Sequence, residues 1–313
     1  GEDTAFEVSV TNPNQLAAQI DTLRPLSAEN IPAFALPNAA QQVRSICQAR
    51  MTELYGACPL EPIRSRLEEE LTLFGDEARS SLFLLAHDVT EKLHRRGVPT
   101  WLRDPMGSTL ISYFLQISDV NPLPAHHRCP KCKYTEFVPE AGSGYDLPKA
   151  VCPHCGTPMQ GDGHTIPYET ALGSHGITIE VPRSEHHRAI GYIADYLGQE
   201  RVAFGGTFGG MWPSKIQSLI ADRLQDADEE TILQSKDKLR NVKCSKGTMH
   251  GTLLLLPEGM HFCDITPLQK LEESIGGVGF VTHMQGWHLW TVLSYISVIG
   301  SEKLEQLFQI SQA

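Results

Sequence analysis

The first hundred residues carry the apolar spacing of amphipathic helices, with hydrophobic side chains three or four positions apart. Glycine recurs where each periodic stretch stops, and glycine readily adopts the backbone conformation that ends a helix. The pattern predicts one helix capped by Asn38 and ended by Gly56, a second from about Glu61 to Gly75, and a third that ends at Gly97.

Short apolar runs elsewhere predict strands. They are VPTWL at 98–102, ITIEV at 177–181, TLLLL at 252–256 and VGFVTH at 278–283. Phe6, Val8 and Val10 alternate with polar residues and predict another short strand near the start. The alternation in ITIEV places Thr178 and Glu180 on one face of its strand. Glu180 is therefore either part of a catalytic carboxylate pair or a charge on a solvated strand.

Further helices are expected from Gly107-Ser108 through Leu115, and from 183 to Gly198. Residues 200–245 read as a strand and two short helices, whereas 287–299 fits either a strand or a helix. Helices and strands in this order predict an α+β fold.

Residues 126–163 are rich in Cys, Pro and Gly and have almost no periodic apolar pattern. Two CPxC pairs lie within this segment, Cys129 with Cys132 and Cys152 with Cys155. Two such turns bring four thiolates to one centre, which is the arrangement of closed structural zinc sites. We expect zinc, with a redox pair and an iron–sulfur site as alternatives. His126 and His127 lie just before the first pair, so one of them is a candidate outer partner or replacement ligand.

The net charge is −11, so phosphate-binding lysines are not expected over the whole surface. No apolar run approaches the roughly 20 residues that span a bilayer, so no membrane is expected as a partner. The other four of the eight cysteines are scattered, which indicates a reduced chain and a cytoplasmic location.

Two glycine-containing stretches are weak candidates for phosphate binding. Gly107-Ser108 would offer free backbone N–H groups at a helix start, although Asp104 would repel a phosphate and Ser108 could act as a simple cap. FGGTFGGMW at 204–212 lacks the order of known nucleotide-binding motifs, and a flexible turn is the expected structure.

Several longer segments together resemble the palm region of the C-family bacterial replicative DNA polymerases, specifically the PolC-type DNA polymerase III alpha subunit. They are EVSVTNPNQLA, ISDVNPLPAHHRCPKCKYTEF, SGYDLPKAVCPHCGT and DGHTIPYETALG, with weaker matches in VKCSKGTMHGTLLLLP and DITPLQ. Nearly the whole chain follows the order of these family segments. In that family the four cysteines hold a structural zinc.

The resemblance implies a nucleotidyltransferase-like palm, a mixed sheet backed by helices, with a Cys₄ zinc insert and a small helical thumb-like insert. We expect four parts. Residues 1–97 form the mainly helical N-terminal part of the palm module, and 98–182 form palm with the zinc insert at 127–160. Residues 183–245 form the thumb-like helical insert, and 246–313 form the C-terminal part of the palm.

The chain departs from the family where the family carries its catalytic aspartates. Thr178, Glu180 and Ser297 stand at those three positions. The family's phosphate loop keeps Arg103, Gly107 and Ser108 here, but Asp104 and Pro105 lie between them. The remaining candidates for nucleic-acid contact are Lys215, Lys243 and Lys246.

These departures favour a degenerate, non-catalytic homologue that acts as a binding or accessory protein, with replication proteins or weakly bound primed DNA as partners. Catalytic Mg²⁺ is not expected, because neutral hydroxyls bind it poorly. One alternative is a nucleotidyltransferase that uses Glu180 with Asp264 or Glu169 as substitute ligands. Another is a domain of a longer, working DNA polymerase. The sequence leaves the oligomeric state open.

Overall fold

The computed structural model describes residues 2–19, 31–174, 176–210, 213–223, 228–240 and 242–312. The chain divides into two compact units, Gly1–Pro32 and Ala33–Ala313. No helix among the described residues is both long and apolar enough to cross a membrane.

The first unit is helical, so the strand predicted at Phe6–Val10 is wrong. It contains α1 (Glu2–Phe6), the π-helical segment η1 (Glu7–Thr11) and α2 (Asn12–Ala17). Phe6 and Val8 are 61% and 63% exposed. Alternating apolar residues favour a strand only where a partner strand and a buried face exist, and this segment has neither among its described residues.

Three long helices begin the second unit, as predicted. They are α3 (Ala39–Tyr55), α4 (Glu61–Phe74) and α5 (Glu77–His94). Gly56 follows α3 with φ +85°, a conformation that glycine adopts without strain. Asn38 precedes α3, but its side chain makes no capping hydrogen bond. Asp76 does cap α5, by accepting a hydrogen bond from the Arg79 N–H.

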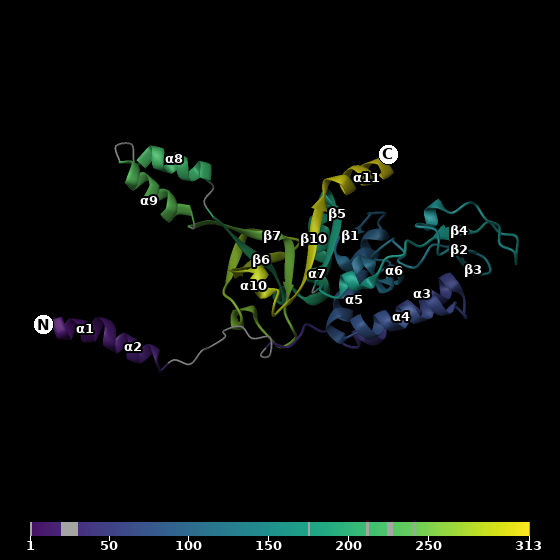
Figure 1. The fold of residues 1–313 in the computed structure, drawn as a ribbon, viewed down its shortest axis with the longest axis horizontal. Helices are drawn as coiled ribbons and strands as arrows, with labels where there is room; N and C mark the ends of the chain where they lie inside the picture. The colour runs from purple at the N-terminus through teal and green to yellow at the C-terminus, as the bar shows by residue number, and fades with distance from the viewer. Residues whose placement is uncertain are drawn as a thin grey trace. The chain divides into compact units, whose positions relative to one another are not determined.

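Seven strands form the main sheet of the described residues, in the order β1-β5-β10-β7-β6-β9-β8. Figure 1 labels β1, β5, β10, β7 and β6 of this sheet. The β5–β10 and β6–β9 pairs are parallel and the other neighbours are antiparallel, so the sheet is mixed. The strands are β1 (Trp101–Leu102), β5 (Gly176–Pro182), β6 (Val202–Gly210), β7 (Lys243–Leu255), β8 (Leu268–Ile275), β9 (Val278–Gln285) and β10 (Ser294–Ser301).

The two faces of the central strands differ in chemistry. Ile177 and Ile179 of β5 and Val298 of β10 are buried in the core, where α5 and α7 (His186–Leu197) pack against these strands. Thr178, Glu180 and Ser297 alternate with them and therefore lie on the opposite face. Thr178, Glu180 and Ser297 therefore lie on the face of the sheet that points away from the helical core.

The glycine-rich stretch 204–210 belongs to β6, so the predicted flexible turn is wrong. A Cβ on Gly206 would lie 2.1 Å from the Thr282 carbonyl oxygen of β9, and one on Gly205 would lie 3.3 Å from the Cα of Gly286. At Gly206 the neighbouring backbone is too close for any side chain, whereas at Gly205 a side chain would make a tight contact.

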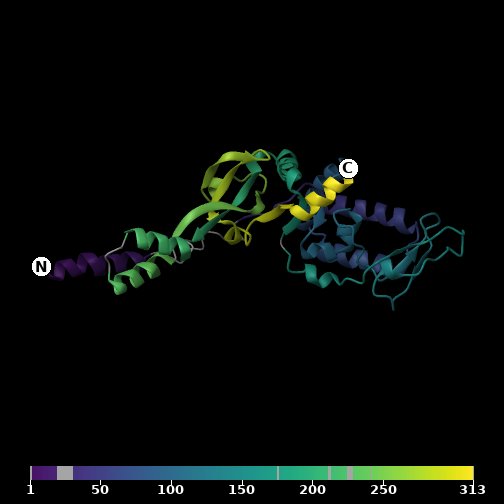
Figure 2. The ribbon, with the colours of Figure 1, turned by 90° about the horizontal axis from the view of Figure 1, so that it is seen from above.

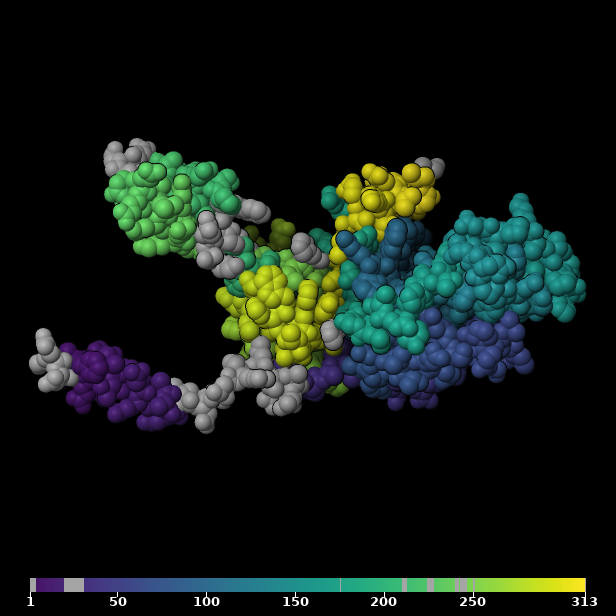
Figure 3. Space-filling view, in the orientation of Figure 1, coloured from purple at the N-terminus to yellow at the C-terminus, as the bar shows by residue number. Residues whose placement is uncertain are grey.

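The segment expected as a helical insert, 183–245, contains core elements as well. Helix α7 packs on the sheet and β6 is one of its strands. Between β6 and β7 the described residues form α8 (Pro213–Arg223) and α9 (Glu229–Arg240), which pack against each other in a separate lobe (Figures 2 and 3).

The cysteine-rich segment contains a small three-stranded sheet in the order β3-β2-β4. Its strands are β2 (His126–Arg128), β3 (Thr135–Phe137) and β4 (Gln160–Asp162). The remaining short helices are η2 (Pro105–Ser108), α6 (Leu110–Phe114), η3 (Gly144–Asp146), η4 (Tyr168–Ala171), η5 (Arg183–Glu185), η6 (Gln199–Arg201), η7 (Phe262–Asp264), α10 (Gly286–Leu289) and α11 (Glu302–Gln312).

Candidate functional site

Three hydroxyl side chains form a row across the centre of the sheet. Thr178 of β5 pairs in register with Ser297 of β10, and Ser297 pairs with Thr252 of β7. Paired residues on adjacent strands point to the same face. The Thr252 and Ser297 hydroxyls share a hydrogen bond of 2.8 Å, and Ser297 is only 6% exposed. The row carries no charge, and two of its three hydroxyl groups hydrogen-bond with each other.

Glu180 is the one acid among the three positions, and it already has a partner. Its Oε1 accepts a hydrogen bond of 2.9 Å from Arg103 Nη1. The Glu180 side chain is 18% exposed, whereas that of Arg103 is 61% exposed. The pair ties β5 to the loop that follows β1, and it offsets the negative charge of the carboxylate.

The loop after β1 is held by Asp104. The Asp104 carboxylate accepts hydrogen bonds from the Met106 N–H at 2.8 Å and from the Thr178 N–H. Burial raises the pKa of Asp104 to about 6, although these two hydrogen bonds act in the opposite direction. An acidic side chain therefore occupies the backbone donors that a bound anion would use.

Gly107 and Ser108 also have partners inside the loop. The Gly107 N–H donates to the Asp104 carbonyl oxygen at 3.0 Å. The Ser108 hydroxyl donates to the Pro105 carbonyl oxygen at 2.8 Å and accepts a hydrogen bond from Thr170. Helix α6 begins after Thr109, whose hydroxyl accepts from the Ser112 N–H, so Thr109 caps this helix instead of Ser108.

The ion pair between Arg66 and Glu70 of α4 supports the loop that follows β1. Glu70 is fully buried and accepts hydrogen bonds from Arg66 Nε at 2.5 Å and from the Ile111 N–H at 3.1 Å. Arg66 also donates to the carbonyl oxygens of Ser108 and Ile166. Helix α4 thereby fixes the start of α6 and the end of η2.

The remaining basic candidates lie elsewhere in the chain. Lys215 is exposed on α8. Lys243 and Lys246 belong to β7, but their side chains lie outside the described residues.

The substitute metal ligands also have other roles. Asp264 caps η7 by accepting a hydrogen bond of 3.0 Å from the His261 N–H, and Glu169 lies in η4. Among the described residues, the four cysteines are the only group of three or more His, Cys, Asp or Glu side chains placed to hold a metal ion.

The four cysteines converge as their spacing predicts. The ligand atoms of Cys129, Cys132, Cys152 and Cys155 all lie within 4.8 Å of one another. The Cys129–Cys155 and Cys132–Cys152 sulfur pairs are 3.5 and 3.4 Å apart. A tetrahedral ion with Zn–S bonds of about 2.3 Å needs sulfur atoms about 3.8 Å apart, so the group fits a metal ion such as zinc.

The environment differs among the cysteines: the pKa of the Cys129 and Cys155 thiols is lowered, whereas that of the Cys132 thiol is raised to about 12. A hydrogen bond with the Thr157 hydroxyl lowers the pKa of the Cys155 thiol to about 6, and thiolates are the form that binds metals. Cys129 and Cys152 are buried while Cys132 is exposed. Four protein ligands leave no open coordination position, which is typical of structural rather than catalytic sites.

The adjacent histidines are not part of the metal group. His126 instead hydrogen-bonds with the Tyr55 hydroxyl at 3.1 Å and with the Pro124 carbonyl oxygen at 2.7 Å. Burial lowers the pKa of His126. The expectation of a replacement ligand is therefore wrong for His126.

A buried polar network below the small sheet was not expected from the sequence. Asn121 donates to the Tyr55 hydroxyl at 2.8 Å and to Asp162 Oδ2 at 2.9 Å. Tyr113 donates to the same Asp162 oxygen at 3.1 Å. These contacts join α3, α6 and the metal-binding segment across 40 or more residues of sequence, so no local pattern could reveal them.

A mixed sheet backed by helices, with polar positions on the opposite face and a four-cysteine insert, defines a polymerase palm-like domain. The family model described as "Bacterial DNA polymerase III alpha NTPase domain" matches residues 41–237. The chain belongs to this family.

Curated relatives extend the similarity over nearly the whole chain. "DNA polymerase III PolC-type" of Thermotoga maritima is 31% identical over 96% of this chain, which corresponds to 23% of that protein. The proteins of the same description from Bacillus subtilis and Latilactobacillus sakei are 28% and 29% identical, again over 96% of this chain and 22% of theirs. The chain thus spans less than a quarter of the length of these relatives.

Proposed function

We propose that this chain is a non-catalytic homologue of the PolC-type polymerase palm and acts as a binding or accessory protein. The observation that carries the proposal is the neutral pair Thr178 and Ser297, in register across β5 and β10, beside a Glu180 that is engaged by Arg103. Replication proteins and primed DNA are the proposed partners, in a cytoplasmic setting.

The chemistry of nucleotide transfer supports the proposal. Two divalent ions roughly 3.5–4 Å apart hold an in-line displacement at phosphorus. Mg²⁺ prefers anionic oxygen ligands, and neutral hydroxyls such as those of Thr178 and Ser297 cannot bridge two ions. Glu180 is one methylene longer than aspartate, and a displacement on the order of 1 Å can cost about 100-fold in rate.

Nucleic-acid binding is proposed to be weak. Non-specific affinity depends on lysine and arginine side chains that displace counterions from phosphates, and the chain has a net charge of −11. In the loop, Asp104 takes up the backbone donors and Glu180 holds Arg103. Arg103, Gly107, Ser108, Lys215, Lys243 and Lys246 remain the positions at which such contact is proposed.

The bound metal is proposed to be zinc, in a structural role. The sulfur geometry fits it, and the surrounding segment has few apolar residues with which to fold alone. Catalytic Mg²⁺ is not part of the proposal.

Primer extension tests the proposal directly. The full chain is incubated with a labelled primer–template, the four deoxynucleotides and either Mg²⁺ or Mn²⁺, and Glu180→Gln is the matched control. An intact PolC-type polymerase verifies the assay. We expect no extension by either form of the chain.

The alternative is an active nucleotidyltransferase with a substituted metal site. Its supporting observation is that Glu180 keeps one carboxylate on the open face of β5. Extension that disappears in Glu180→Gln would establish this alternative and contradict the proposal. A dissociation constant for primed duplex below about 1 µM at about 0.15 M salt would contradict the weak binding.

A further inference from the structure

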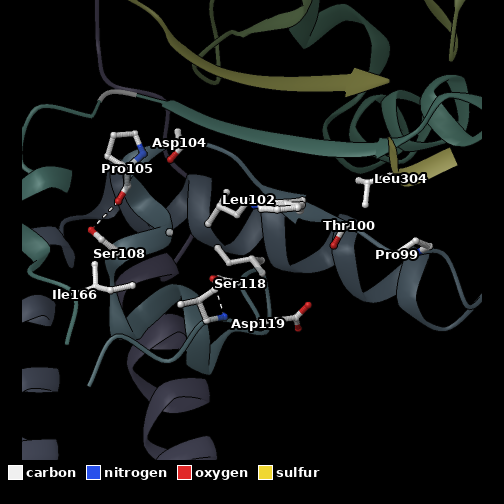
Figure 4. Close-up of a pocket in the computed structure, with 14 residues that line it drawn as sticks. Pro99, Thr100, Leu102, Asp104, Pro105, Ser108, Ser118, Asp119, Ile166 and Leu304 are labelled. Carbon is white, nitrogen blue, oxygen red and sulfur yellow. Dashed lines mark hydrogen bonds between the residues drawn. The ribbon is translucent and has the colours of Figure 1, made fainter. Parts of the chain in front are cut away.

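A cavity of about 540 Å³ lies at the edge of the main sheet, beside β1 (Figure 4). Its walls come from 99–102, from the η2 loop, from 117–120 and from Leu304 of α11. A cavity of this size accommodates a small organic molecule. Gly107 and Ser108 of its η2 wall are also positions of proposed phosphate contact, but the functions considered so far leave the apolar part of the cavity unused.

The interior of the cavity is apolar. Leu102, Ile117 and Leu304 line it and are at most 7% exposed themselves. Trp101 and Val120 also line it and are 61% and 40% exposed. An exposed tryptophan beside an apolar cavity offers a ring face to a ligand, and such faces attract cations.

The charges in the lining have one sign. Asp104 and Asp119 are both present, and the lining contains no lysine, arginine or histidine. The Asp104 carboxylate is bound by the Met106 and Thr178 N–H groups. Asp119 is exposed, and no hydrogen bond or ion pair joins its carboxylate to any other residue that the structure describes.

Arg103, the nearest basic residue in the sequence, does not offset the negative charge of the cavity lining. Arg103 is paired with Glu180 on the adjoining strand and is not among the lining residues. A phosphate or carboxylate beside Asp119 would face that carboxylate without a compensating cation among the lining residues, so anionic ligands are disfavoured there.

We propose that this cavity binds an amphipathic aromatic cation. The ring enters the apolar interior between Leu102 and Leu304, and the positive group remains at the mouth near Asp119 and the Trp101 ring. The burial of apolar surface supplies affinity, while the free carboxylate supplies selection by charge.

The experiment follows the indole N–H signal of Trp101 in ¹⁵N-labelled full-length chain, with Trp101→Phe to assign the signal. Three probes of similar size are compared: 2-phenylethylamine, 3-phenylpropionate and phenyl phosphate. We expect a saturable shift with the amine and an affinity at least about fivefold weaker for each anion.

Asp119→Asn should remove this discrimination between the amine and the anions. Asp195→Asn is the matched control, because Asp195 is an exposed acid of α7 outside the cavity. Both are surface substitutions, and an unchanged spectrum of the free protein verifies folding. The proposal is overturned if the amine gives no saturable shift, if the anions bind within fivefold of it, or if Asp119→Asn keeps the preference.

Discussion

Thr178 and Ser297 stand directly opposite each other on the parallel strands β5 and β10, 119 positions apart in the sequence. Both side chains are neutral, and Ser297 directs its hydroxyl to Thr252 on the next strand. The centre of the sheet therefore needs no bound cation to balance charge at these two positions.

The substitution Ser297→Asp should destabilise the fold by about 3 kcal/mol or more, because it buries a carboxylate whose neighbours are hydroxyls. Ser297→Ala removes only the bond with Thr252 and should cost about 1 kcal/mol. Urea unfolding measures both. Equal stability of Ser297→Asp and the wild type would show that this position tolerates a carboxylate and would contradict its neutral, buried environment.

The contribution of Asp104 to stability should depend on pH. Its pKa is raised from 3.8 to about 6, so between these values the folded chain holds a proton that the unfolded chain has released. The contribution of this group is then most favourable below about pH 4, and it decreases as pH rises towards 6.

Asp104→Asn removes the titrating group, so the difference in unfolding free energy from wild type should change between pH 4 and 6 and be constant above that range. Asp195→Asn serves as an exposed control with a pH-independent difference expected. A difference for Asp104→Asn that is constant from pH 4 to 7 would refute the raised pKa.

Cys152→Ser should abolish stoichiometric metal binding, because the remaining three thiolates cannot close a tetrahedral site. Elemental analysis of the wild type should find about one zinc per chain. Hydrogen exchange should show loss of protection mainly in 127–160, since the flanking strands have their own apolar contacts. Cys263→Ser is the control, an exposed cysteine outside the group, and retained metal in Cys152→Ser would disprove the assignment.

Glu70→Ala should cost about 3–5 kcal/mol of unfolding free energy, because Arg66 and the Ile111 N–H lose a buried partner. Glu68 lies on the same helix as Glu70, and Glu68→Ala, which breaks its exposed pair with Arg44 of α3, should cost at most about 1 kcal/mol. Equal losses in the two variants, measured by chemical denaturation, would rule out a special role for the buried pair.

Gly206→Ala should destabilise the sheet by about 2 kcal/mol or more, since its Cβ would lie 2.1 Å from the Thr282 carbonyl oxygen. Gly279→Ala in β9 has no atom within 4 Å of the new methyl group, so it should change stability by less than about 0.5 kcal/mol. Thermal unfolding compares the two. Equal melting temperatures would mean that β6 and β9 separate easily.

The sequence correctly predicted features that are set by residues close together in the chain. Each CPxC turn brings its own two cysteines together because it is set by four adjacent residues, and the ITIEV alternation correctly separated Thr178 from Ile179. Glycines in β6 were misread, because the same residue type serves flexible turns and tight backbone contacts.

The distant contacts could not be predicted in this way. The Arg103–Glu180 pair spans 77 residues, and the Tyr55–His126 hydrogen bond spans 71. Each depends on how whole elements pack, for which a single sequence carries no periodic signal. The resemblance to the polymerase family identified the positions Thr178, Glu180 and Ser297, but their partners came only from the structure.

Helices α8 and α9 form a lobe that is joined to the sheet at the adjacent ends of β6 and β7. Strands β6 and β7 pair antiparallel up to Gly210 and Lys243, so the two ends of the helical lobe leave the sheet side by side. A short hairpin turn is sufficient to join such ends. The helical lobe can therefore be shortened or replaced by another module, in evolution or by protein engineering, without changing the hydrogen-bond register between β6 and β7.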